Sequence, residues 1–187
     1  MTDKSLDELI GARLKSLRES RSLSLGELAE LSGVSKAMIA RVEKAQSSAT
    51  AALLGRLCAG LGARLSSVVA AEDERQERLS RREEQPVWRD PQTGYLRRQV
   101  SPRDAASGIE IVSIELPAGA QVPYEAWTAN PYAQQLLMLA GELDLRIGDE
   151  PYRLREGDCV DFDVMRPNLF ENRGRKPARY LVIIRKA

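Results

Sequence analysis

A short stretch near the N-terminus carries small and basic side chains at the spacing of one helix face. An amphipathic helix opened by Ser35 would leave five residues facing solvent: Lys36, Ala37, Ala40, Arg41 and Lys44. Ammonium and guanidinium groups donate hydrogen bonds to DNA phosphates and base edges, and short side chains let a helix enter the major groove. The spacing predicts a DNA-contacting helix. An ordinary helical hairpin with its polar face in water remains the alternative.

Two helices joined by a tight turn must hold this basic face. Gly33 ends the first helix, because glycine adopts a positive φ without a Cβ clash. Ser24 and Glu27 form a capping box for the first helix, and Ser35 is a favourable N-cap for the second. The two apolar faces consist of Leu25, Leu28 and Ala29, and of Met38, Ile39 and Val42. The pattern indicates a helix-turn-helix.

Three further helices complete the predicted N-terminal unit. Apolar residues recur at i, i+3 and i+4 over residues 6–21 and 50–61, and a short helix is expected over residues 65–70. Gly62 marks the end of the fourth helix. Most of these helices are too short to persist alone, so we expect a compact bundle with a shared core.

Composition excludes several classes of protein. Of the 187 residues 43% are hydrophobic, yet no apolar run approaches the roughly 18 residues of a membrane span. The charged, amphipathic N-terminus is no signal peptide. Cys58 and Cys159 both have apolar neighbours, so we expect buried free thiols and a cytoplasmic protein. The chain has no histidine, which removes the commonest metal ligand and general acid–base group.

Charge and texture divide the chain into three parts. Residues 1–70 carry ten Lys and Arg against seven Asp and Glu, a weakly basic balance that makes DNA affinity depend on a few cations and on two copies of the domain. Residues 71–86 are dense in charge and are expected to form a partly helical linker that Pro86 closes. A second domain occupies residues 87–187.

Short β-rich segments fill the second domain. The candidate strands are residues 95–100, 108–116, 134–139, 143–147, 150–154, 159–162, 169–171 and 178–184. They are separated by Gly, Pro and Asp turns and show no helical period, which predicts an antiparallel barrel or sandwich. The expected fold class is therefore α+β with two domains: a five-helix bundle followed by an antiparallel β-barrel of jelly-roll type.

Residues 24–69 resemble the lambda-repressor-like, or XRE-type, DNA-binding domain. The motifs that carry the resemblance are Ala29-x-x-x-Gly33-Val34-Ser35 and Ile39-x-x-Val42-Glu43. The resemblance implies that Ser35, Lys36, Ala37, Ala40 and Arg41 approach base edges or phosphates. It also implies backbone contacts from Ser24, Lys44, Ser47 and Ser48. Two departures are Gly26, where the family often has a long polar residue, and Ala45, where a glycine often ends the recognition helix.

The second domain looks like a cupin. Its motifs run through Pro117-Ala118-Gly119, Gly141-Glu142-Leu143, Gly157-Asp158-Cys159, Arg166-Pro167-Asn168 and Asn172. Cupin enzymes hold a metal with histidines and a carboxylate, whereas the corresponding residues here are Glu125, Trp127, Gln134 and Asn168. Such a set binds zinc, iron or copper poorly. We therefore expect no metal, no cofactor and no catalytic residue.

The resemblance leaves two roles for the interior of the barrel. Seven residues should line its mouth: Tyr124, Trp127, Tyr132, Gln134, Met138, Asn168 and Phe170. Aromatic walls with a few amides suit a small organic effector. Alternatively, these side chains fill a vestigial barrel. Inward-facing amides need partners, which favours an effector.

The expected function is that of a homodimeric, one-component transcription regulator that binds a double-stranded DNA operator. The cupin domain would dimerise and sense a small molecule. Two alternatives stay open at this point: a cupin enzyme with an attached DNA-binding domain, and an antitoxin-like autorepressor.

Overall fold

The computed structural model describes residues 3–69, 78–102, 107–127 and 132–185. The chain divides into two compact units, residues 1–71 and 72–187, and each is described by itself. Residues 71–77 of the expected linker lie outside the described residues. Residues 82–84 form a turn rather than a helix, and the side chain of Gln85 donates to the carbonyl of Val100. None of the described helices is both long and apolar enough to cross a bilayer.

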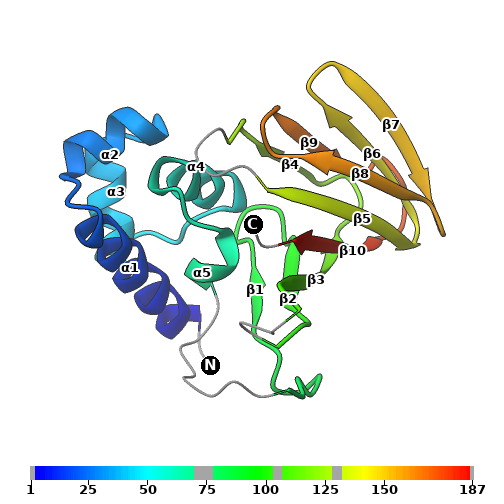
Figure 1. Ribbon diagram of the computed structural model, residues 1–187, viewed down its shortest axis with the longest axis horizontal. Coiled ribbons are helices and arrows are strands. Elements are labelled where there is room, and N and C mark those ends of the chain that lie inside the picture. Colours follow the sequence, from blue (N-terminus) through cyan, green and yellow to red (C-terminus); the bar gives the residue numbers. More distant parts are fainter. Residues whose placement is uncertain (1–2, 70–77, 103–106, 128–131, 186–187) are drawn as a thin grey trace. The chain divides into compact units, whose positions relative to one another are not determined.

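Five helices are described in the first unit (Figure 1). They are α1 (Asp3–Ser20), α2 (Leu25–Ser32), α3 (Lys36–Glu43), α4 (Ala51–Leu61) and α5 (Leu65–Val69). Their apolar faces meet in one core, whose most deeply buried side chains are Ile10, Leu14, Leu28, Ile39, Leu54, Leu57 and Leu61. The expected α+β class with a helical N-terminus is confirmed.

The predicted helix ends are confirmed by their capping geometry. The Ser24 hydroxyl accepts from the backbone N–H of Glu27 at 3.1 Å, and the Glu27 carboxylate accepts from the backbone N–H of Ser24 at 2.8 Å. The bond from the Ser24 backbone lowers the pKa of Glu27. Ser35 caps α3, and Gly33 and Gly62 end α2 and α4 with φ of 64° and 59°. These caps are local signals, which explains why the sequence reveals them.

Helix α1 crosses α3 at Gly11, where the backbones come very close. A Cβ built on Gly11 would lie 2.5 Å from the carbonyl oxygen of Val42 and 2.9 Å from that of Glu43. Real Cβ atoms do not approach backbone oxygens so closely, so only glycine fits. Gly11 therefore sets the distance between α1 and α3.

Replacing Gly11 with alanine is expected to destabilise the helical unit. Overpacking of a core costs about 1–3 kcal/mol, which exceeds the gain of up to ~1 kcal/mol that alanine has over glycine in a helix. Gly26→Ala is the matched control, because the nearest atom to its added Cβ would be Ser24 Oγ at 3.7 Å. Urea unfolding followed by far-UV circular dichroism should show a lower midpoint for G11A and an equal or higher one for G26A. Equal midpoints for G11A and the unchanged protein would contradict the close crossing.

Ala45 follows α3 in the left-handed region, with φ of 52°. Its N–H donates to the carbonyl of Val42, and the N–H of Gln46 donates to that of Arg41. A glycine would adopt this backbone conformation without a Cβ clash. For alanine, the left-handed conformation costs about 1–2 kcal/mol, because its Cβ comes too close to the following carbonyl oxygen.

The second unit consists of two antiparallel sheets (Figure 1). Their strands are β1 (Val87–Arg89), β2 (Leu96–Gln99), β3 (Ile109–Leu116), β4 (Gln121–Tyr124), β5 (Ala133–Ala140), β6 (Glu142–Ile147), β7 (Glu150–Arg155), β8 (Cys159–Asp163), β9 (Asn168–Glu171) and β10 (Ala178–Arg185). The six-stranded sheet has the order β1-β2-β3-β10-β5-β8, and the four-stranded sheet has the order β4-β9-β6-β7. Hydrogen bonds among the described residues do not close the two sheets into the expected barrel.

The inner faces of the two sheets pack through aromatic side chains. Phe170 on β9 stacks on Tyr180 on β10 with ring centroids 6.1 Å apart, and it meets Phe162 on β8 edge-on at 5.9 Å. The alternating burial of β3 and β10 puts every second residue into this interior.

One ion pair and one amide stand out among the buried polar groups. Arg97 Nη2 lies 3.4 Å from Glu110 Oε1, and the two side chains are 9% and 6% exposed. Asn172 is fully buried: its Nδ2 donates to the carbonyls of Leu116 and Lys176, and its Oδ1 accepts from the N–H of Gly174. The final residue of the predicted cupin motif thus holds a loop together.

Two features of the second unit differ from expectation. Strands β1 and β4 were not predicted, because β1 has three residues and β4 contains Pro123. Both are edge strands, the position in a sheet where proline is tolerated. Cys159 is exposed rather than buried, because residues alternate along β8 and Phe162, three positions later, points into the interior. Cys58 is buried as expected.

Candidate functional site

Helix α3 presents its basic residues to solvent. Lys36, Ala37 and Arg41 are exposed, and Ala40 between them is half-buried. Ser35 is exposed at the N-cap, where its Oγ accepts from the N–H of Met38 at 3.3 Å. The structure therefore brings the predicted residues of α3 onto one side of the helix, with short side chains between the two cations.

The opposite side of α3 is fixed by packing and by an ion pair. Ile39 and Val42 are 1% and 2% exposed. Arg18 on α1 donates from Nε to Glu43 Oε1 at 2.7 Å and from Nη2 to Oε2 at 2.9 Å, and its Nη1 donates to the carbonyl of Leu23 at 2.8 Å. The hydrogen bonds to Glu43 raise the pKa of Arg18 against the effect of burial. Sequence analysis missed this pair, which sets the orientation of α3.

The remaining predicted DNA contacts lie near the ends of α2 and α3. Lys44 is exposed at the C-cap of α3, Ser47 is half-buried and Ser24 is exposed. Ser48 is exposed as well, but its hydroxyl donates to the carboxylate of Asp7. Two of the four predicted backbone contacts, Ser24 and Ser48, thus already make a hydrogen bond within the unit.

The predicted effector residues fall into two groups in the second unit. Tyr124 pairs with Asn168 across β4 and β9, and its ring lies edge-on to Phe170 at 5.8 Å. Met138 lies opposite Tyr180, on which Phe170 stacks. Tyr124, Asn168, Phe170 and Met138 therefore gather at the inner faces of the two sheets.

Trp127 and Tyr132 form the second group. Their ring centroids are 5.7 Å apart in an edge-on arrangement, and Trp127 is buried while Tyr132 is half-buried. Gln134 is half-buried on β5 and pairs with Phe162 on β8. Among the described residues, the side chain of Gln134 makes no hydrogen bond or ring contact with either group.

The amide of Asn168 has a fixed orientation. Its Nδ2 donates to the carbonyls of Asp163 and Arg166 at 3.1 and 3.0 Å. Its Oδ1 is buried and accepts no hydrogen bond from the described residues, while the residue as a whole is 4% exposed. An oxygen held in this way calls for a donor hydrogen from a ligand or a water molecule.

The residues at the metal-binding positions of cupins do not fit a metal in this chain. Glu125 is exposed, and the Nδ2 of Asn168 is engaged by backbone carbonyls. Trp127 has no lone pair to offer as a ligand. Among the described residues, no three His, Cys, Asp or Glu side chains are grouped as metal ligands would be.

Tyr124 is also unsuited to proton transfer near neutral pH. Burial raises the pKa of Tyr124 well above its ordinary value, with a further contribution from its neighbour Tyr95, whose hydroxyl lies 3.5 Å away. The phenol therefore stays protonated near neutral pH and is a weaker acid than an ordinary tyrosine, and the neighbouring Glu125 is exposed.

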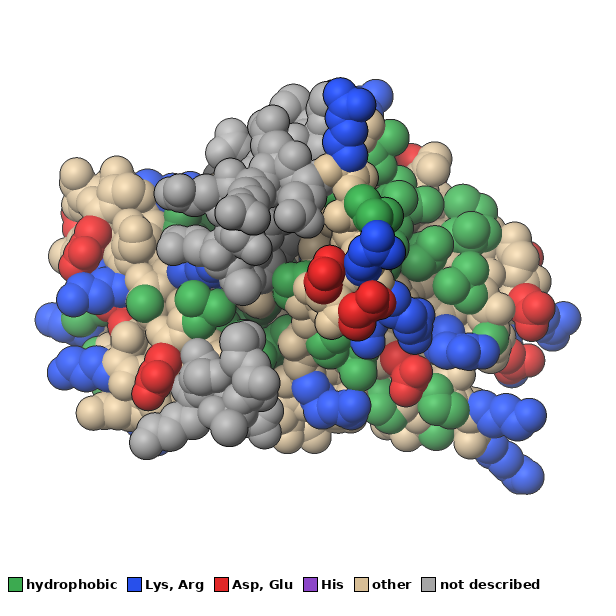
Figure 2. All heavy atoms as spheres, turned by 90° about the horizontal axis from the view of Figure 1, so that it is seen from below, with side chains coloured by type: hydrophobic (Ala, Val, Ile, Leu, Met, Phe, Trp, Pro, Cys, Tyr) green, Lys and Arg blue, Asp and Glu red, His purple; other side chains and the backbone are tan. Residues whose placement is uncertain are grey.

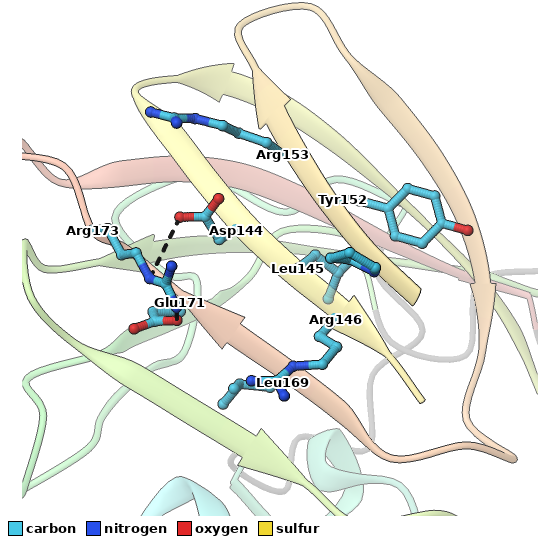
Figure 3. Close-up of a pocket in the computed structure, with 9 residues that line it drawn as sticks. Asp144, Leu145, Arg146, Tyr152, Arg153, Leu169, Glu171 and Arg173 are labelled. Atoms are coloured by element: carbon cyan, nitrogen blue, oxygen red, sulfur yellow. Dashed lines mark ion pairs between the residues drawn. The ribbon is translucent and has the colours of Figure 1, made fainter. Parts of the chain in front are cut away.

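A shallow hollow of about 330 Å³ lies on the four-stranded sheet (Figure 3). Its lining comprises Asp144, Leu145, Arg146, Pro151, Tyr152, Arg153, Leu169, Glu171 and Arg173, and none of the seven predicted effector residues. Arg173 lies 2.7 Å from Glu171 and 3.9 Å from Asp144. Arg153 pairs with Glu142 at 2.7 Å. Ion pairs exposed to water contribute little to the stability of the fold. Because the charges in this hollow are already paired, little charge is left to attract a ligand.

Comparison with known proteins identifies a family for each of the two units. Residues 9–70 match the family model of a helix-turn-helix domain, and residues 112–184 match that of a cupin domain. The chain is thus a two-domain protein that joins a helix-turn-helix domain to a C-terminal cupin domain.

Two relatives align along the whole chain. The HTH-type transcriptional regulator SutR of Escherichia coli (strain K12) is 28% identical over 185 residues, which cover 97% of each chain. The crystal structure of an HTH_3 family transcriptional regulator from Vibrio cholerae superposes with a TM-score of 0.82 at 26% identity, covering 100% of this chain and 99% of that one. The chain is thus homologous to XRE-type helix-turn-helix transcriptional regulators that carry a cupin domain.

A more distant structural neighbour is an enzyme. Hydroxypropylphosphonic acid epoxidase from S. wedmorenis shares 19% identity with a TM-score of 0.48, over 97% of this chain and 99% of the other. This likeness assigns no activity to the present chain.

Proposed function

We propose that this regulator binds a double-stranded DNA operator through the solvent-facing side of α3. The observation that carries the proposal is the exposure of Lys36 and Arg41 on either side of Ala37 and Ala40. A helix with two donors separated by short side chains enters the major groove without steric conflict. Ser35 is placed to reach the same base edges or phosphates from the helix N-terminus.

The remaining contacts are assigned to the DNA backbone. Lys44 offers an ammonium group at the end of α3, and Ser24 and Ser47 offer hydroxyls nearby. Ser48 joins them once its hydroxyl leaves Asp7. Few cations are involved, so affinity should fall with salt at a slope that corresponds to a small number of phosphates.

One helical unit reads only half of a symmetric operator. Two units whose recognition helices are about one DNA turn apart, roughly 34 Å, read both halves. We propose that the cupin unit supplies this pairing as a homodimer. A small organic effector would change operator affinity only if it binds one arrangement of the dimer better than another.

Asn168 supports the existence of such an effector. Its buried Oδ1 accepts no hydrogen bond from the described residues, Asn168 pairs with Tyr124 across β4 and β9, and the effector would supply the missing O–H or N–H donor. We assign the cupin unit no enzymatic activity, because its described residues group no three side chains that could hold a metal ion. Elemental analysis of the purified protein tests this assignment, and stoichiometric iron, zinc, manganese or nickel would overturn it.

Genome-wide footprinting of the bound sites tests the regulatory assignment directly. We expect imperfect palindromes whose half-sites are centred about one DNA turn, roughly 10 base pairs, apart. Sites without two-fold symmetry would contradict dimeric binding. The absence of reproducible sites would contradict operator binding altogether.

A further inference from the structure

The solvent-facing side of α3 carries two kinds of group that can distinguish bases. Lys36 and Arg41 provide N–H donors, and Ala37 and Ala40 provide methyl groups. Among the described residues, no hydrogen bond or ion pair engages the side chain of Lys36 or Arg41. Both cations can therefore turn to a DNA base without first giving up a partner in the protein.

Helix α3 itself offers DNA no carboxylate or amide oxygen as an acceptor. Its eight residues include neither Asn nor Gln, and their single carboxylate belongs to Glu43. Arg18 donates to the two oxygens of Glu43 at 2.7 and 2.9 Å, and the Glu43 side chain is only 6% exposed. Proteins read cytosine with a carboxylate and adenine with an amide. Two targets are left: guanine, whose O6 and N7 accept from Lys or Arg, and thymine, whose methyl group packs against alanine.

The charge of the helical unit gives it little general attraction for DNA. Figure 2 shows Asp and Glu side chains beside Lys and Arg on the visible face of this unit, at the left. Residues 1–70 carry ten Lys and Arg against seven Asp and Glu. Non-specific affinity comes from neutralised phosphates and is therefore weak here. The preference for an operator over other DNA thus depends on the base contacts of α3.

The order of the side chains around α3 determines the pattern of bases that they reach. At about 100° per residue, Lys36 and Arg41 stand about 140° apart around the helix, with Ala40 and Ala37 between them. When the alanines face the floor of the groove, the two cations point toward opposite strands. Lys36 and Arg41 are also about 7.5 Å apart along the helix axis, which corresponds to about two base-pair steps of DNA.

We propose that each operator half-site presents one guanine on each strand, about two base-pair steps apart, to Lys36 and Arg41. The methyl group of a thymine between them packs against Ala37, which is exposed whereas Ala40 is half-buried. The inference rests on operator binding by α3, as proposed above. It goes further because it names the atoms that are read: O6 and N7 of guanine and the C5-methyl group of thymine.

Selection from random duplexes with the full-length protein supplies the DNA for the test. The duplexes are long enough for two half-sites, and binding of the enriched sequence is measured by fluorescence anisotropy. We expect each enriched half-site to carry guanine on both strands. Enriched half-sites with guanine on one strand only, or on neither, would overturn the inference and leave operator binding intact. Enrichment of no sequence would overturn operator binding and this inference together.

Replacement of single groups in the enriched duplex tests which atoms are read. 7-Deazaguanine lacks N7 and should weaken binding about 10-fold at each contacted guanine, because one of its two acceptors is lost. Uracil at the contacted thymine removes only the methyl group and should weaken binding about fourfold, the value of one buried methyl group. 7-Deazaadenine is the matched control and should change the affinity less than about twofold. Sensitivity to 7-deazaadenine instead of 7-deazaguanine would overturn the inference.

Protein variants assign each base to its side chain. In Lys36→Ala, 7-deazaguanine at one of the two guanines should cause no further loss, and in Arg41→Ala the same should hold for the other guanine. Ala37→Gly removes the protein methyl group and should abolish the effect of uracil. Thermal unfolding by circular dichroism verifies that the variants are folded. Losses that add in full would show that these side chains do not contact those bases, and would overturn the assignment.

Discussion

Replacing Lys36 and Arg41 together with alanine is expected to lower DNA affinity by about 100-fold or more. A well-placed contact to a base contributes about 1–3 kcal/mol, and each 1.4 kcal/mol corresponds to a factor of ten. Both side chains are exposed and their backbone is held by the buried side of α3, so their removal should leave the fold intact. Fluorescence anisotropy with a footprinted site measures the loss, and the salt slope should fall by about one for each phosphate contact removed.

The matched control removes two cations from the other unit. Arg155 and Arg175 are exposed on the cupin unit, so R155A/R175A changes the net charge equally. Non-specific attraction to DNA would weaken in both double variants, whereas an operator contact weakens only in K36A/R41A. Equal affinity of K36A/R41A and the unchanged protein would contradict the assignment of α3.

Replacing Glu43 with alanine is expected to cost the helical unit about 3 kcal/mol. The change removes both carboxylate oxygens of Glu43 that accept from Arg18, whose side chain is 11% exposed. The guanidinium then keeps only the carbonyl of Leu23 and the more distant, exposed carboxylate of Glu19, 3.8 Å from its Nη2, among the described contacts. Breaking a buried pair on one side typically costs 3–5 kcal/mol, and the lower end applies here because part of Arg18 reaches water. Urea unfolding followed at a helix-specific wavelength measures the loss.

A double variant separates the ion pair from the packing around it. Arg18→Met with Glu43→Leu removes both charges, and well-packed apolar replacements of buried pairs are often neutral. We expect this variant to recover most of the stability that E43A loses. A loss below about 1 kcal/mol in E43A would show that Arg18 is solvated and that packing alone orients α3.

Local signals account for most of what the sequence predicts correctly in the helical unit. The capping box of Ser24 and Glu27 and the left-handed Gly33 depend on residues within one or two turns. The pair of Arg18 and Glu43 joins residues 25 positions apart and leaves no such signal. The close contact between α1 and α3 at Gly11 also joins residues far apart in the sequence. From the sequence alone, a glycine within α1 indicates only a weak helix former.

In the cupin unit, alternation predicts strands but not their assembly. The segment at residues 143–147 shows a clear period of two and appears in β6. Strand β4 is not predicted, because it contains Pro123 and proline usually ends a strand. The proline is tolerated because β4 lies at the edge of its sheet. The effector residues follow from a resemblance and not from alternation. The structure brings Tyr124, Asn168, Phe170 and Met138 to the inner faces, while Trp127 and Tyr132 form a separate contact.

The inward ion pair of Arg97 and Glu110 has a consequence for how the chain folds. Strand β2 reads Leu96-Arg97-Arg98-Gln99, so its own polarity does not decide which arginine faces inward. A slip of one residue would turn Arg97 out to water and separate it from a carboxylate that stays inside, at a cost of several kcal/mol. The acid on β3 therefore favours the register in which Arg97 faces the interior over the register in which Arg97 faces water.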